Sequence, residues 1–290
     1  MQPSLHAGLF SLIHVCLPFY SPLNNTLFGG ADLKEKRYGL DLTQGKISTV
    51  LLKFAGPFVA ANLVNALHGV ISMLVVGMFA GSEVISGVAT GSQVLFPLYS
   101  FMMGLGTSGT VLIARSIGEK NKEAGTKALG SFTITSAALV VFLTLFMIFM
   151  REPLIVWLRT PADAIASARR YVVVSTFGTP FNVAFTMLSA IARGIGNSKA
   201  PSIIASISCV INIALSLLFV GVFGLAEAGV AAAASVAQFI SFICIGVWLL
   251  RCQLPFPFTV KDIRPDGKSI RYLLVVGFPV ILQEDRKSVV

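Results

Sequence analysis

Uncharged polar side chains recur at helical spacing inside one long apolar stretch of the chain. Asn62, Asn65, His68 and Ser72 follow one another at steps of three, three and four residues, which places them on one face of a helix. Amide and hydroxyl oxygens can accept hydrogen bonds or coordinate a cation, and the imidazole of His68 can carry a proton. This face is therefore a candidate site for an ion or a small molecule.

Similar polar stripes occur in further apolar stretches, and two interpretations are open for any one residue. The side chains could form hydrogen bonds between helices, each contributing about 1 kcal/mol or less, or they could line a shared hydrated cavity. Five polar stripes are more than packing alone needs, so we expect a cavity of substrate size. The candidate substrate- and ion-binding residues are Asn62, Asn65, His68, Ser72, Gln93, Asn182, Asn212, Ser216, Ser235 and Gln238.

Other kinds of chemistry lack the residues that they would need. The sequence contains no motif for nucleotide phosphates or nucleophilic catalysis, and no cluster of His, Asp or Glu for an intramembrane enzyme. The four cysteines show no metal-binding spacing and are interpreted as small buried hydrophobic residues. We therefore expect no enzyme, no metal site and no cofactor, with Na+ or H+ as a coupling ion.

Long uncharged runs must position these side chains. Of the 290 residues, 55% are apolar and 12% are charged, with a mean hydropathy of +0.82. Six runs without Asp, Glu, Lys or Arg exceed the roughly 20 residues that cross a bilayer as a helix, and a seventh stops after twelve residues. The runs are 54–82, 84–114, 128–150, 171–192, 200–226, 228–250 and 272–283. They predict an all-α integral membrane protein and exclude a nucleic-acid-binding protein.

The basic residues predict which side of the membrane each loop faces. With the N-terminus inside, the inside segments hold sixteen Lys and Arg, whereas the outside loops hold four. Because cytoplasmic loops are enriched in Lys and Arg, this count predicts a multi-pass membrane protein with a cytoplasmic N-terminus. The net charge of +9 then follows from topology, and the lipid bilayer is the expected partner.

Short motifs along the chain form two groups. The first is Asp41-Leu42-Thr43-Gln44-Gly45, Gly56-Pro57, Val76-Gly77, Gly91-Ser92-Gln93 and Ala114-Arg115-Ser116-Ile117-Gly118-Glu119. The second is Ala192-Arg193-Gly194-Ile195-Gly196-Asn197-Ser198-Lys199-Ala200-Pro201, Asn212 and Ala228-Gly229-Val230-Ala231. In this order they resemble the multidrug and toxic compound extrusion (MATE) family over about residues 41–283.

The resemblance implies both an architecture and an activity. It implies a twelve-helix transporter with two six-helix lobes around a central cavity, of which this chain holds the N-terminal lobe and the start of the seventh transmembrane helix. It also implies a secondary active transporter, a cation-coupled antiporter that exports drugs or other bulky organic compounds, often organic cations, by alternating access.

The sequence departs from the family at two positions. In the family, the positions of Ser72 and Ser216 often carry Asp, and with Asn212 and a hydroxyl at the position of Ser235 they form a proton- or sodium-binding cluster. Here both carboxylates are absent, so the cluster can form hydrogen bonds but cannot carry a proton at ordinary pH. Cation coupling through this cluster is therefore not expected, and coupling through the second lobe stays open.

A pattern shared by two segments predicts the domain organisation. Lys46 to Val59 contains a basic residue, Leu-Leu and then Gly-Pro, and Arg271 to Val280 contains a similar series, as if a second repeat began there. The expected divisions are an N-terminal segment 1–45, interpreted as a false start, and a six-helix lobe 46–271 with a cytoplasmic loop 251–271. The beginning of the seventh helix follows at 272–283, then a non-native tail at 284–290. The C-terminal lobe of the same protein is the expected missing partner.

Two alternative functions stay open at this point. A lipid-linked oligosaccharide flippase of the same superfamily would line its cavity with several arginines or lysines, and the six runs have none in their interiors. A membrane channel or a structural membrane protein would show no counter-flow of cations that depends on substrate.

Overall fold

The computed structural model describes residues 82–119, 122–158, 164–252 and 265–289 continuously, together with residues 73–79, 81, 161 and five single positions between 55 and 70. All of them belong to one compact unit, Tyr38–Val290. The candidate residues Asn62, Asn65, His68 and Ser72 lie outside the described residues, as does the expected segment boundary at 45.

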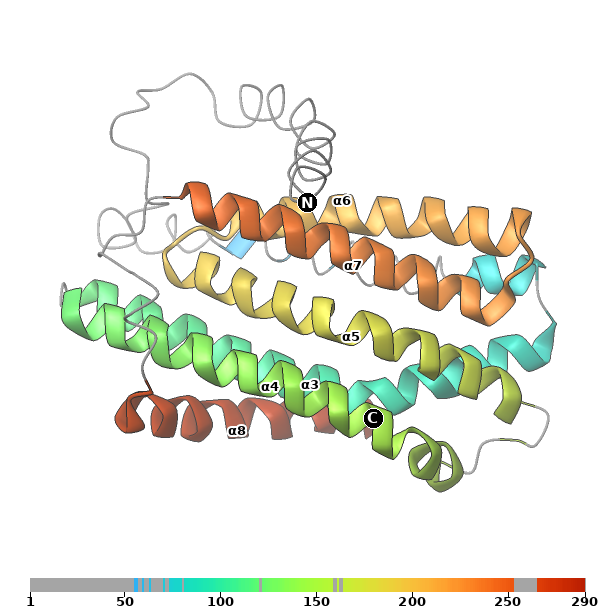
Figure 1. The fold of residues 1–290 in the computed structure, drawn as a ribbon, viewed down its shortest axis with the longest axis horizontal. Coiled ribbons are helices and arrows are strands. Elements are labelled where there is room, and N and C mark those ends of the chain that lie inside the picture. Colours follow the sequence, from blue (N-terminus) through green and yellow to red (C-terminus); the bar gives the residue numbers. More distant parts are fainter. Residues whose placement is uncertain are drawn as a thin grey trace, which may run out of the picture. The chain divides into compact units, whose positions relative to one another are not determined.

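All the secondary-structure elements of the described residues are helices (Figure 1). The elements are α3 (Ser82–Gly118), α4 (Lys122–Trp157), α5 (Ile165–Gly194), α6 (Lys199–Ser216), the π-helix η1 (Leu217–Val222), α7 (Ala226–Arg251) and α8 (Gly267–Val289). By length and composition, five helices could cross a membrane: α3, α4, α5, α6 together with η1, and α7. The predicted all-α membrane fold is confirmed for the part of the chain that the structure describes.

The predicted runs agree with these helices, with one correction. Four of the runs, from 84–114 to 228–250, lie wholly within single helices, and the seventh run lies within α8. The uncharged run 200–226 extends beyond its helix, because the chain leaves the helix after η1 and turns back into α7. Only part of the first run is described, and residues 73–79 within it are helical.

Helices α3, α5 and α7 lie side by side and run in the same direction (Figure 1). The Oγ1 atom of Thr110 in α3 donates a hydrogen bond of 3.1 Å to the carbonyl of Ala190 in α5, 80 residues further on. Near the other end of the same two helices, Gly91 faces the ring of Tyr171, again 80 residues on. A constant sequence offset along two helices means that they are parallel. Alternate crossings of the bilayer produce this arrangement.

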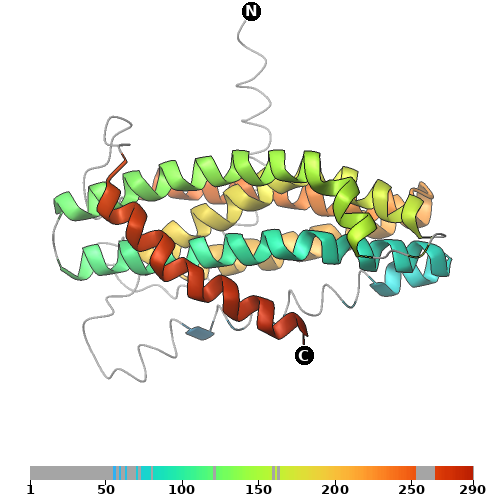
Figure 2. The same ribbon diagram turned by 90° about the horizontal axis from the view of Figure 1, so that it is seen from below.

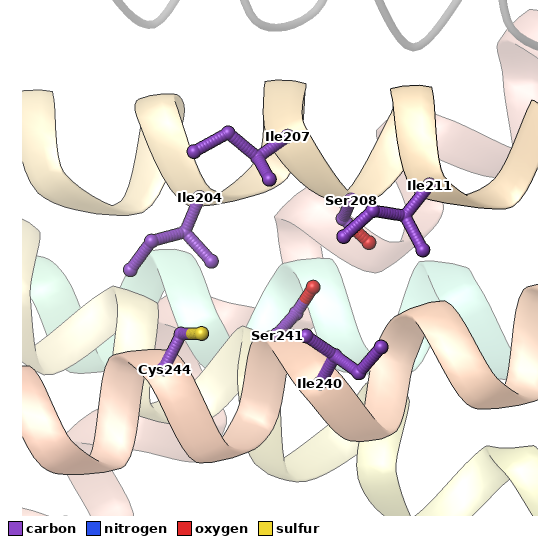
Figure 3. A pocket seen from close by; sticks show the side chains of 7 residues that line it. All are labelled: Ile204, Ile207, Ser208, Ile211, Ile240, Ser241 and Cys244. Carbon is purple, nitrogen blue, oxygen red and sulfur yellow. The ribbon is translucent and has the colours of Figure 1, made fainter. Parts of the chain in front are cut away.

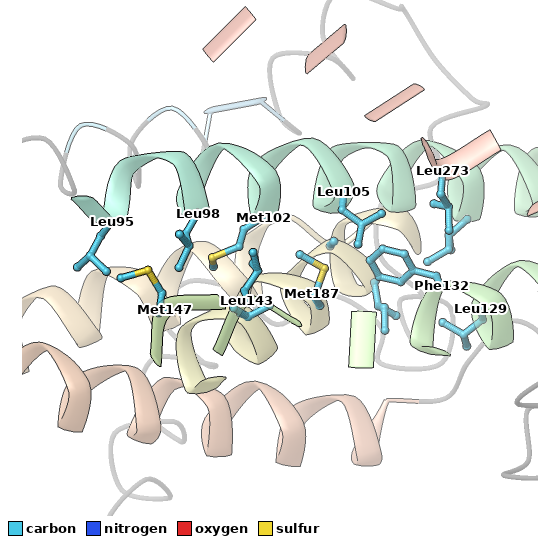
Figure 4. Close-up of a cluster of buried hydrophobic side chains, with 14 of the residues drawn as sticks. Leu95, Leu98, Met102, Leu105, Leu129, Phe132, Leu143, Met147, Met187 and Leu273 are labelled. Carbon is cyan, nitrogen blue, oxygen red and sulfur yellow. The ribbon is translucent and has the colours of Figure 1, made fainter. Parts of the chain in front are cut away.

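The main core lies where α3, α4, α5 and α8 meet, and Figure 4 shows its labelled side chains. Phe132, Leu143 and Met147 of α4 are fully or almost fully buried against α3 and α5. Leu273 of α8 is also buried there, while α8 crosses α3 and α4 obliquely (Figure 2). Small residues permit this crossing, because a Cβ atom on Gly277 would lie 3.2 Å from the carbonyl oxygen of Gly104.

The outward-facing side chains are apolar, as expected for helices in contact with lipid. Phe142 and Phe149 of α4, Phe177 of α5 and Val210 of α6 are exposed. In α6 the pattern is the reverse of a soluble helix: its buried side is rich in Ser and Asn, whereas isoleucine and valine face outward. The polar groups of this helix are therefore directed into the bundle.

An aspartate fixes the start of α8. The Oδ2 atom of Asp266 accepts hydrogen bonds from the backbone N–H of Ser269 at 2.9 Å and from its hydroxyl at 2.7 Å. The backbone N–H of Asp266 donates to the Oγ atom of Ser131 in α4 at 2.9 Å. Asp266 is thus the N-cap of α8 and also joins this helix to α4.

Removing this cap should destabilise the docked helix, and we expect Asp266→Ala to cost about 0.5–2 kcal/mol. The hydroxyl and then the backbone N–H of Ser269 lower the pKa of Asp266 from its ordinary value. A carboxyl with a lowered pKa stabilises the fold above its unfolded-state pKa of about 3.9, and this stabilisation is lost as the pH falls through the lowered value. Thermal unfolding of the purified chain in detergent, followed from neutral to acidic pH, measures both effects. Asp266→Asn should still cap the helix, but the part of the pH dependence of stability that comes from Asp266 should disappear. Equal unfolding midpoints for the Ala and Asn variants at neutral pH would mean that the side chain of Asp266 does not cap α8.

Candidate ion and substrate site

Two candidate residues of α6 form a buried polar pair. The Oγ atom of Ser216 donates a hydrogen bond of 3.3 Å to the Oδ1 atom of Asn212, one helical turn earlier. Asn212 is 5% exposed and Ser216 is 1% exposed. The i, i+4 spacing brings the two side chains onto the same face of the helix, and that face points into the bundle. Both groups are neutral, so the pair offers oxygen atoms without a formal charge.

The helix changes its hydrogen-bond pattern directly after this pair. Residues Leu217–Val222 form η1, and the backbone N–H of Phe223 donates to the carbonyl of Leu218, five residues back, at 3.1 Å. Such π-helical turns are rare and are frequent at functional sites, because they add a residue to one turn and re-aim the side chains that follow. The sequence analysis missed this feature, since the run is uniformly apolar and carries no local signal for it.

Two candidates lie in α7, and one of them, Ser235, contacts α5. Ser235 donates to the carbonyl of Ala231 at 2.8 Å and lies against Gly178 of α5, where a Cβ atom would be 2.8 Å from the Cβ atom of Ser235. The Oε1 atom of Gln238 is buried and has no hydrogen-bond partner within the described part of the chain. A buried amide oxygen without a partner is unfavourable, so this atom is available to a water molecule, an ion or a substrate.

Asn182 of α5 is half-buried and comes directly after Phe181, whose ring contacts α7. The rings of Phe181 and Phe239 meet edge to face with centroids 5.0 Å apart. Since α5 and α7 are parallel, Asn182 lies at about the level of Gln238 along the bundle. Gln93 of α3, by contrast, is exposed, and no contact given by the structure joins it to the other candidates.

A small pocket lies between α6 and α7 (Figure 3). It is lined by Ile204, Ile207, Ser208, Ile211, Ile240, Ser241 and Cys244 and has a volume of about 30 Å³. Both serine hydroxyls donate to the carbonyl of Ala237, at 3.2 Å from Ser208 and 2.9 Å from Ser241. A space of this size holds a water molecule and not a bulky organic compound. The predicted substrate-sized cavity therefore does not correspond to this pocket and stays a prediction.

One charged residue that the sequence analysis did not select is buried. Glu227, in the first turn of α7, is 3% exposed and forms an ion pair with Arg170 of α5, with 2.6 Å between Oε1 and Nε. Its only signal in the sequence is that it stands alone between two long uncharged runs. The structure shows no group of three or more His, Cys, Asp or Glu residues that could hold a metal ion among the residues it describes.

Several curated relatives of the chain are bacterial proteins named for multidrug resistance or multidrug export. It is 25% identical over 243 residues to the probable multidrug resistance protein YpnP of Bacillus subtilis, covering 84% of this chain and 54% of that protein. It is 28% identical to the probable multidrug resistance protein YoeA of the same species, covering 78% and 50%. The multidrug export protein MepA of Staphylococcus saprophyticus is 24% identical, with coverage of 80% and 51%. The chain thus spans about half the length of these relatives.

Solved structures share the fold. A MOP superfamily transporter from Pyrococcus furiosus matches with a TM-score of 0.80 at 23% identity, covering 87% of this chain and 56% of that one. An outward-facing multidrug resistance MATE family transporter matches with the same TM-score, identity and coverage. The sequence model of the MatE family matches residues 57–218, more than half of the chain. By this match, and in agreement with the fold, the chain belongs to the MatE family.

Proposed function

We propose that the chain forms one lobe of a secondary active transporter that exports drugs or other bulky organic compounds, among them organic cations, in exchange for a cation. Three curated relatives carry multidrug resistance or multidrug export in their names, which supports this activity. A second six-helix lobe is the proposed partner. The lobes would open alternately to the two sides of a bacterial cell membrane, with the N-terminus in the cytoplasm.

The buried Asn212–Ser216 pair is the observation that carries the proposal. A polar pair inside a membrane-crossing helix is unfavourable unless it meets other polar groups or water, and such groups mark substrate and ion pathways. The unpartnered amide oxygen of Gln238 is a second polar group buried within the same bundle. Together these groups favour a transport pathway over a purely structural membrane protein.

The coupling ion is Na+ or H+, and the described candidates constrain how it could bind. Amide and hydroxyl oxygens coordinate sodium, but with no formal charge the Asn212–Ser216 pair should hold it weakly. Neither side chain titrates at ordinary pH. We therefore place the coupling step at His68 or at a carboxylate of the second lobe, and not at this pair.

A flux measurement tests this assignment. In the chain joined to a second lobe and reconstituted in liposomes, we expect Ser216→Ala to leave ethidium-induced release of protons or sodium unchanged. The serine hydroxyl does not ionise at ordinary pH, and without a formal charge it should hold sodium only weakly. His68→Ala or the loss of a carboxylate in the second lobe should largely abolish release. Ser206→Ala, half-buried on the same helix, is the matched control.

Two outcomes would contradict the proposal. If Ser216→Ala abolishes ion release while ethidium still binds, the first lobe holds the ion without a carboxylate. If the parent protein moves ions whether or not an organic cation is present, it is a channel. Transport of a lipid-linked oligosaccharide in place of ethidium would favour the flippase.

A further inference from the structure

The ion pair between Arg170 and Glu227 differs from the other ion pairs of the described chain. Its arginine side chain is 65% exposed, whereas its carboxylate is 4% exposed. In the remaining four pairs, which involve Arg115, Lys127, Arg151 and Arg169, both side chains are at least 37% exposed. Exposed pairs contribute little, because water screens both charges, but a buried carboxylate depends on its partner. Glu227 therefore depends on Arg170 to compensate its buried charge, whereas the carboxylates of the other four pairs are compensated by water as well.

Arg170 is held rigidly by its own helix. The next residue, Tyr171, fills the space over Gly91 of α3, where a Cβ atom would be 2.5 Å from the ring. One turn earlier, Ser167 lies equally close to Gly87. These two contacts hold the backbone of this part of α5 against α3, which gives Arg170 a defined place from which its side chain reaches the start of α7.

The segment that precedes Glu227 is strained. Ala226 has a φ of 40°, and it is the one residue other than glycine with positive φ in the described chain. Gly224 adopts a φ of 64° two residues earlier. An alanine in the left-handed region is unfavourable and persists only where surrounding contacts impose it. Here the contact that follows is the ion pair of Glu227.

This strained turn is continuous with η1 and with the Asn212–Ser216 pair. The backbone N–H of Leu225 donates to the carbonyl of Phe219 at 3.0 Å, so the turn closes directly onto the π-helix. Within η1, Val220 is buried in a cluster with Val76, Val88 and Val230, whereas Val222 is exposed. In this π-helical register Val220 faces the buried cluster and Val222 is turned away from it.

We propose that Glu227 is a positioning residue: held by Arg170, its carboxylate keeps the turn between η1 and α7 in its strained form and thereby fixes the register of η1, directly after the Asn212–Ser216 pair. The inference rests on the proposed function in taking that pair as part of the transport pathway. Without the ion pair, the turn relaxes and η1 returns to an α-helix. The residues after Ser216 then rotate by about 100° around the helix axis, one residue position.

A single spin label detects this rotation. The full chain, with Cys16, Cys209, Cys244 and Cys252 replaced by serine, receives a nitroxide at Val222→Cys, a position that is 72% exposed. In phosphatidylcholine vesicles, dissolved oxygen should collide often with this lipid-facing label. We expect Arg170→Gln to lower the collision rate markedly, because the label turns toward the packed side of the helix. Arg170→Lys keeps the positive charge and should restore most of the parental rate.

The adjacent arginine provides the matched control. Arg169 lies in the same turn of α5, but it pairs with Glu152 of α4, which is itself partly exposed. Arg169→Gln should leave the collision rate unchanged. An equal change in Arg169→Gln and Arg170→Gln, or an unchanged rate in Arg170→Gln, would overturn the proposal. If Arg170→Gln does not fold, Glu227→Gln is used instead, because it breaks the ion pair without leaving a buried charge. An unchanged collision rate in Glu227→Gln would also overturn the proposal. Since no transport is measured, the outcome is independent of whether the protein exports drugs.

Discussion

Replacing Gly178 by alanine is expected to force α5 and α7 apart and to lower the free energy of unfolding by about 1–3 kcal/mol. The added Cβ atom would lie 3.0 Å from the Cα atom of Ser235, and a backbone atom cannot move aside as a flexible side chain can. The loss should appear although alanine favours a helix over glycine by roughly 1 kcal/mol. Reversible unfolding in a detergent–denaturant titration measures it.

A second glycine gives the matched control for this change. Gly246, in α7, has no atom of a neighbouring element in the described chain within 4 Å of the position where its Cβ would lie. Gly246→Ala should therefore leave stability unchanged or raise it slightly. The two variants are expected to differ in sign, and a loss of stability in both would mean that close contact between α5 and α7 is not the cause. Under the proposed function, with Ser235 as part of the substrate site, Gly178→Ala should also weaken ethidium binding.

Gly109 and Phe132 should show strong coupling in a double-mutant cycle. A Cβ atom on Gly109 of α3 would lie 2.5 Å from the Cζ atom of Phe132, a fully buried residue of α4. Gly109→Ala alone should cost about 1–3 kcal/mol, because the ring must leave its place in a close-packed core. In a Phe132→Leu background, the same change should cost much less.

The expected coupling between these two residues lies within the range of about 0.5–3 kcal/mol that contacting residues show. Phe132→Leu alone should also destabilise the protein, because the smaller side chain makes fewer packing contacts. Since lipid is as apolar as the core, these contacts, and not the transfer of the side chain out of water, are what the variant loses. The same denaturant titration measures all three variants. Strictly additive effects would mean that the ring does not fill the space beside Gly109.

The helices could be predicted from the sequence because lipid imposes a simple rule on it. A run such as 128–150 has no charge, so it can only cross the bilayer or be buried. The actual helices extend further at both ends, as α4 does from Lys122 to Trp157. Charged residues in these end turns can pair along the helix, as Lys127 does with Glu123, and absence of charge therefore underestimates helix length.

The candidate site was predictable only where its pattern is local. The four-residue step from Asn212 to Ser216 is sufficient to place both on one helical face, and the structure joins them by a hydrogen bond. Their roles stay predictions. The π-helix η1 and the burial of Glu227 could not be predicted. Val220 of η1 is buried in a cluster with Val76 and Val88, and Glu227 pairs with Arg170, all of which are distant in the sequence.

The parallel arrangement of α3 and α5 has a consequence for how the protein is made. Contacts such as Thr110 with Ala190 join residues 80 positions apart, and an intervening helix separates them. At a synthesis rate of about 5–20 residues per second, α3 is in the membrane for roughly 4–16 s before its partner emerges. During that interval the side of α3 that later receives α5, from Gly87 to Gly106, lacks its helical partner. The contacts between α3 and α5 can therefore form only after α5 has been synthesised, so this part of the bundle closes after α3 and α4 have entered the membrane.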